Sequence, residues 1–63
     1  METVAYLVYP KTHKGYIPSV VVRLKRKKGE KHSEYEVAAA GAAEFFKVEG
    51  IEFDIDDLDG HTI

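Results

Sequence analysis

The sequence predicts a small α+β domain in which one helix packs on a short, mainly antiparallel sheet, in the order β-β-α-β. Two runs rich in β-branched and aromatic residues open the chain, an Ala-rich segment follows them, and an alternating apolar and acidic run lies near the end. At 63 residues the chain is long enough for one hydrophobic core, so we take residues 1–63 as a single domain.

The two expected strands of the first half are residues 3–9 and residues 16–26. The first is a compact apolar run closed by Pro10, which indicates a strand buried on both faces or lying in a dimer interface. The polar residues 11–15 separate it from the second run, where alternate side chains share one face: Val20, Val22 and Leu24.

Residues 33–48 have two interpretations, of which we favour a helix. Ser33 and Glu36 have the spacing of a capping box, Lys47 suits the last turn, and Gly50 suits the left-handed residue after it. Apolar side chains then recur at helical spacing and predict the buried face: Tyr35, Ala38, Ala39, Ala42, Phe45 and Phe46.

The alternative is a five-stranded small barrel, with residues 32–38 and 44–48 as two further strands. Opposite charges support it, because Glu34 and Glu36 could pair across strands with Arg23 and Lys25. The Ala-rich run at 38–43 favours the helix, since Ala has the highest helix propensity and a poor strand propensity.

The end of the chain is expected to form one more strand and a tail. Ile51, Phe53 and Ile55 alternate with acidic residues, which is typical of a strand buried on one face. The remaining residues, 57–63, are expected to form a loose acidic tail.

Charge divides the chain into a basic and an acidic half. Residues 1–32 hold eight Lys/Arg and two Asp/Glu, a net charge of +6, whereas residues 33–63 hold one Lys and nine Asp/Glu, a net charge of −8. The basic residues expected to contact nucleic acid are Lys11, Lys14, Arg26, Lys27, Lys28 and Lys31, because clustered cations neutralise phosphates. Tyr9 or Tyr16 could stack on a base.

An alternative function comes from the acidic half. There the chain would be a protein-interaction module, such as an inhibitor, an antitoxin or a phage-type accessory protein, that docks a basic protein partner. Its contact residues would be Glu52, Asp54, Asp56 and Asp57. The two halves could also neutralise each other, with Arg23 and Lys25 paired to Glu52, Asp54 or Asp56.

Enzymatic chemistry is not expected. The chain has no Cys, which excludes thiol catalysis and disulfides, its three histidines are isolated, and no phosphate-binding glycine loop occurs. We therefore expect no catalytic residue, cofactor or metal. The longest apolar or small stretches, 4–9 and 37–43, are shorter than the ~20 residues of a membrane span, and no signal peptide is visible, so a cytoplasmic location is expected. The small core favours a homodimer.

Overall fold

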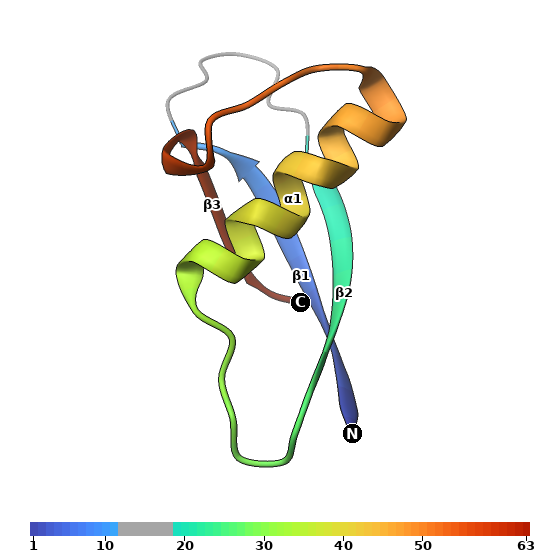
Figure 1. Ribbon diagram of the computed structural model, residues 1–63, viewed down its shortest axis with the longest axis vertical. Helices are drawn as coiled ribbons and strands as arrows, with labels where there is room; N and C mark the ends of the chain where they lie inside the picture. Colours follow the sequence, from blue (N-terminus) through green and yellow to red (C-terminus); the bar gives the residue numbers. More distant parts are fainter. Residues whose placement is uncertain (12–18) are drawn as a thin grey trace.

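The computed structural model describes residues 1–11 and 19–63 and shows the predicted α+β fold. In these residues three strands, β1 (Glu2–Pro10), β2 (Val20–Arg26) and β3 (Leu58–Thr62), form an open sheet in the order β2-β1-β3. The helix α1 (Glu34–Glu49) covers one face of this sheet (Figure 1). The alternative five-stranded barrel is wrong, because residues 34–49 are helical and the sheet stays open.

The central strand is β1, and both neighbours run antiparallel to it. The two edge strands, β2 and β3, are therefore parallel to each other, and the connection through α1 crosses over β1. Figure 1 shows α1 running diagonally across the sheet, from the side of β3 at its beginning to the side of β2 at its end. The chain must then return to the other edge before β3 can begin.

Both ends of α1 are capped by residues that the sequence predicts, Ser33 and Gly50. The Oγ of Ser33 accepts a hydrogen bond from the backbone N–H of Glu36 at 3.1 Å, which satisfies one of the free amides of the first turn. Gly50 has φ 69°, and its N–H donates to the carbonyl of Phe46 at 2.9 Å. A left-handed residue of this kind ends the helix without a steric penalty only when it lacks a side chain.

The buried face of α1 differs from the predicted one. The residues that contact the sheet are Val37, Ala38, Gly41 and Phe45, while Tyr35 is 67% and Phe46 56% exposed. Successive residues of a helix are about 100° apart, so the observed buried face is rotated by roughly 90° about the helix axis from the predicted one. The rotation follows from the close approach of the α1 backbone to β1 at Gly41. A Cβ at position 41 would lie 2.3 Å from the Cγ1 of Val8, so the helix turns its glycine toward β1.

The predicted strand at residues 51–56 and the loose tail at 57–63 are both wrong. Residues 51–54 have no regular structure, a single 3-10 turn, η1 (Ile55–Asp57), follows, and β3 is built from the residues assigned to the tail. The diagonal helix is the reason, since residues 51–54 are used in crossing back to the free edge of β1 (Figure 1). Leu58, opposite Pro10, is then buried.

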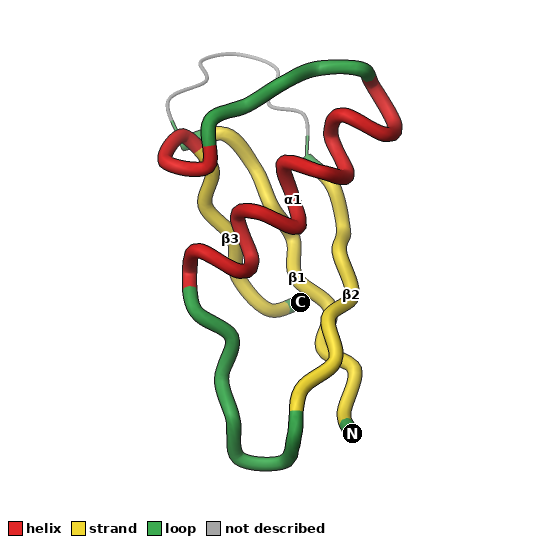
Figure 2. The backbone as a smooth tube through the Cα atoms, viewed as in Figure 1, coloured by secondary structure: helices red, strands yellow, loops and turns green. Residues whose placement is uncertain are grey.

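The core lies between α1 and the sheet. Its buried residues come from the three strands and α1: Tyr6, Val8, Val22, Val37, Ala38, Phe45 and Leu58. The molecule is elongated, 36 × 20 × 18 Å, and Figure 2 shows the loop before α1 at one end and the segment after α1 at the other. No helix in the described residues is long and apolar enough to cross a membrane.

Candidate functional site

The predicted basic residues do not form a single surface. Lys27, Lys28 and Lys31 lie in the loop between β2 and α1, beyond the end of the sheet where Glu2 pairs with Arg26. Lys11 follows the other end of β1, nine residues away, which is about 30 Å at ~3.4 Å per residue. Lys14 lies outside the described residues, as do Tyr16 and His13.

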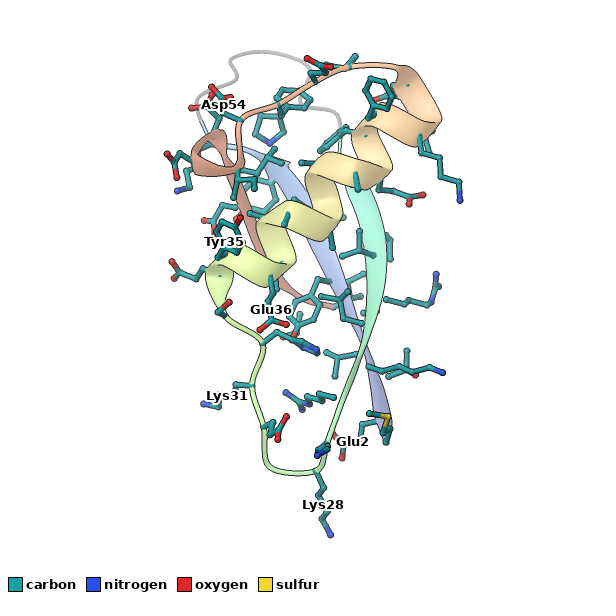
Figure 3. The ribbon with its side chains drawn as sticks, in the orientation of Figure 1. Glu2, Lys28, Lys31, Tyr35, Glu36 and Asp54 are labelled. Atoms are coloured by element: carbon teal, nitrogen blue, oxygen red, sulfur yellow. The ribbon has the colours of Figure 1, made fainter. Side chains whose placement is uncertain are left out.

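The loop cations surround a tight turn, residues 27–30, which we call the basic turn. The N–H of Glu30 donates to the carbonyl of Lys27 at 3.0 Å, and Gly29 has φ 87°, the value that the third residue of a type II turn requires. Figure 3 shows Lys28 pointing away from the body of the molecule, and Lys31 pointing outward from the same loop. These side chains are free to meet a ligand from solvent.

Among the predicted basic residues that the structure describes, Arg26 is the one whose side chain forms an ion pair. Its Nε lies 3.2 Å from the Oε2 of Glu2, the residue that faces it across the sheet. The two side chains are 29% and 50% exposed, so this ion pair adds little stability. The pair does neutralise the charge of Arg26, so the positive charge around the basic turn comes from the lysines.

His32 fastens the loop to the sheet, a role that the sequence did not predict. Its Nε2 lies 2.9 Å from the carbonyl oxygen of Lys25, and its Nδ1 lies 2.8 Å from the hydroxyl of Tyr6. Because a carbonyl can only accept, Nε2 carries the proton, and in the neutral ring Nδ1 accepts from Tyr6. The rings also meet edge to face, with centroids 5.5 Å apart. The basic turn is therefore held in place.

The sheet face opposite α1 is uncovered by any described helix or strand, and we call it the open face. Side chains alternate between faces along a strand, and Tyr6 and Val8 point to the helix, so their neighbours point to the open face. The register brings together residues of three strands: Ala5, Leu7 and Tyr9 of β1, Val21, Arg23 and Lys25 of β2, and Asp59 and His61 of β3.

Aromatic rings and cations occur together on the open face. The rings of Tyr9 and His61 are in contact, with centroids 5.7 Å apart and planes at 59°. Val21, beside Leu7, is 40% exposed, and Arg23 and Lys25 follow along β2 toward the basic turn. The surface is thus apolar and aromatic at its centre, with cations along one edge.

The predicted pairing of these cations with the acidic run is wrong. Arg23 faces Ala5 and Lys25 faces Thr3, because β1 separates β2 from β3. Glu52 and Asp54 belong to no strand. Neither cation forms an ion pair within the described residues, and both are exposed.

Three of the four predicted acidic contact residues line a groove at the opposite end of the molecule from the basic turn. Glu52, Asp54 and Asp57 surround a hollow of about 580 Å³ whose wall includes the exposed ring of Phe46. The other lining residues are Ala42, Ala43 and Phe53, and we call this hollow the acidic groove. Asp56 instead lines a smaller hollow of about 220 Å³ together with Lys11 and Tyr35.

Two further observations concern metal binding and the hydroxyl groups of the described residues. They contain no group of three or more His, Asp or Glu side chains placed to hold a metal ion, and the hydroxyl of Ser33 is used as a helix cap. No family model, curated protein or solved structure matches the chain. The candidate surfaces described above are the open face, the basic turn and the acidic groove.

His61 and Phe46 are two residues of these surfaces that sequence reasoning placed elsewhere. His61 was assigned to a loose tail, and Phe46 to the core. No local signal identifies His61, because the strand that carries it contains one buried residue, Leu58, and shows no alternation. The exposure of Phe46 could have been found only from the rotation that Gly41 imposes on α1.

Proposed function

We propose that the protein is a non-enzymatic domain that binds single-stranded nucleic acid on the open face of its sheet. The observation that carries the proposal is the contact of Tyr9 with His61 on the open face, which no described helix or strand covers and which also presents Arg23 and Lys25. Aromatic rings offer a surface for unpaired bases, and the cations offer charge for the phosphates between them.

The arrangement of these groups fits a path along β2. Arg23 and Lys25 occupy alternate positions of the strand, about 7 Å apart, and the chain leads from them directly into Lys27 and Lys28. Bases would stack on Tyr9 and His61, at the other end of the open face from the turn. The backbone of a bound strand would then run beside the cations from the rings to the basic turn.

A single strand suits this surface better than a duplex. In a duplex the bases are stacked inside, whereas in a single strand their faces are free to stack on protein rings. The protein's net charge of −2 does not oppose binding, because most carboxylates lie on α1 and on the segment after it. Asp59 is the one described acid on the open face, and its Oδ1 accepts the N–H of Gly60 at 2.9 Å.

The test is a fluorescence-anisotropy titration with single-stranded and duplex oligonucleotides at two salt concentrations. We expect the single strand to bind more tightly, and Tyr9→Leu to weaken binding roughly 5- to 150-fold, the loss of one stacked base at ~1–3 kcal/mol. The double variant Arg23→Gln/Lys25→Gln should reduce the salt slope by about 0.7 for each phosphate that the protein no longer neutralises.

Two matched variants on the helix side serve as controls. Tyr35→Leu removes an exposed tyrosine and Lys47→Gln an exposed lysine, both from α1. We expect both to bind like the unchanged protein. Equal losses in the controls, or affinity that does not change with salt, would contradict the proposal.

The homodimer and the cytoplasmic location stay predictions. Leu7, Val21 and Tyr9 would also suit a contact between two open faces, which would bury the proposed nucleic-acid surface. Such a dimer would have to dissociate before an oligonucleotide could bind. Binding that weakens as protein concentration rises would therefore favour the dimer over the proposed function.

A further inference from the structure

We propose that the chain associates with itself head to tail, with the basic turn of one copy seated in the acidic groove of the next. The two surfaces lie at opposite ends of the molecule, as the positions of Lys28 and Asp54 in Figure 3 show. Their charges are complementary, since the turn presents Lys27 and Lys28 and the groove presents three carboxylates.

The acidic groove combines an apolar wall with a carboxylate rim. Phe46 is 56% exposed, and Val48 and Ile51 beside it in sequence are exposed as well. Glu52, Asp54 and Asp57 supply the charge. Such a surface suits a cation on an aliphatic stem, because the stem can lie along the ring while the ammonium reaches the carboxylates.

The basic turn has the shape and the chemistry of that occupant. It is one tight turn, closed by the hydrogen bond from Glu30 to Lys27, and His32 fixes the loop to Tyr6 and Lys25. A segment already held in one conformation loses little entropy on binding. Lys28 at the tip points away from its own molecule, so it is available to a second copy (Figure 3).

The contact has to form between molecules. The turn and the groove lie at the two ends of a body 36 Å long, so the turn of one copy cannot reach the groove of the same copy (Figure 3). A contact between two different surfaces is heterologous, and it produces an open chain or a ring. A single turn in a groove buries less than the ~1,200 Å² of a stable interface, so we expect weak association, with a Kd between ~1 μM and ~1 mM.

Sedimentation velocity over a concentration series tests the proposal. At low salt the average mass should rise with concentration above the monomer mass of 7.1 kDa, and it should return to that value at high salt. Two neutralised variants should each stay monomeric: a turn variant, Lys27→Gln/Lys28→Gln, and a groove variant, Asp54→Asn/Asp57→Asn. Circular dichroism confirms that each variant is folded.

Mixing the two variants gives the sharpest result. The turn variant retains an intact groove and the groove variant an intact turn, so together they should form a one-to-one dimer that does not grow further. As controls, Lys47→Gln and Glu36→Gln change charge on α1 outside both surfaces and should leave self-association intact.

The proposal is overturned if the unchanged protein remains monomeric at ~1 mM and low salt, a concentration at the weak limit of the expected range. It is equally overturned if a dimer forms at every salt concentration and in both the turn variant and the groove variant. Such a dimer would indicate a contact through the open face. The groove variant keeps every residue of the proposed nucleic-acid surface and leaves its basic turn free, so it should bind the oligonucleotide at least as tightly as the unchanged protein.

Discussion

His32 determines how the basic turn is presented, although it takes no direct part in either proposed surface. It lies 26 positions from Tyr6 in the sequence, and its imidazole bonds the Tyr6 hydroxyl and the Lys25 carbonyl. Tyr6 is itself buried in the core under α1. The loop that carries the lysines is thus connected, through one side chain, to the buried core of the molecule.

The prediction at this scale is that Tyr6→Phe destabilises the protein. It removes the hydroxyl that bonds His32 while keeping the ring in the core, so the free energy of unfolding should fall by ~0.5–1.5 kcal/mol, the net value of one hydrogen bond. Urea denaturation followed by circular dichroism measures the change. Tyr35→Phe is the matched control, because Tyr35 is exposed, and its free energy of unfolding should not change.

A double-mutant cycle with His32→Ala separates this bond from other effects. If Tyr6 and His32 interact as described, removing the hydroxyl should cost nothing further once the imidazole is gone. Equal costs of Tyr6→Phe in the two backgrounds would mean that the hydrogen bond does not hold the loop.

At the scale of elements, local signals predicted three of the four main segments. The β-rich runs and the capped Ala-rich run became β1, β2 and α1, because each carries its own propensity and end signals. The last strand was misplaced by several residues. The alternation of Ile51, Phe53 and Ile55 mimics a strand, but Phe53 and Ile55 pack against the core from a connection that has to cross the sheet.

A substitution in β3 can test whether the last residues of the chain form a strand of the folded sheet or a loose tail. Leu58 is 3% exposed and Ile63 75%, although both lie in the segment expected to be loose. Leu58→Ala should lower the free energy of unfolding by ~2–5 kcal/mol, a typical cost of truncating a buried leucine. A domain this small has only about 3–5 kcal/mol in total, so much of the variant should be unfolded at 25 °C.

Ile63→Ala is the matched control for this change. Its side chain is exposed, so the free energy of unfolding should change by less than ~0.5 kcal/mol. Thermal unfolding of both variants gives the comparison. If Leu58→Ala were as stable as Ile63→Ala, β3 would not be part of the folded core.

For the molecule as a whole, the fold turns a division of charge along the sequence into a division in space. The cations follow β2 and its turn, and Glu49, Glu52, Asp54 and Asp57 lie around the end of α1 and the segment after it, although Glu34 and Glu36 lie in the first turn of α1. The candidate surfaces were only partly predictable, because the register of three strands decides which side chains share the open face. The division itself was visible in the sequence, but its geometry depends on the crossover through α1.

The central claim, binding on the open face, is tested most directly by methyl NMR spectra recorded during titration with a single-stranded oligonucleotide. Leu7 and Val21 carry methyl groups on the open face, Ile63 lies beside Ala5, whose carbonyl its N–H bonds, and Val48 and Ile51 carry exposed methyl groups near the end of α1. We predict that the first set shifts and the second does not. Shifts confined to Val48 and Ile51, or an unchanged spectrum, would contradict the account.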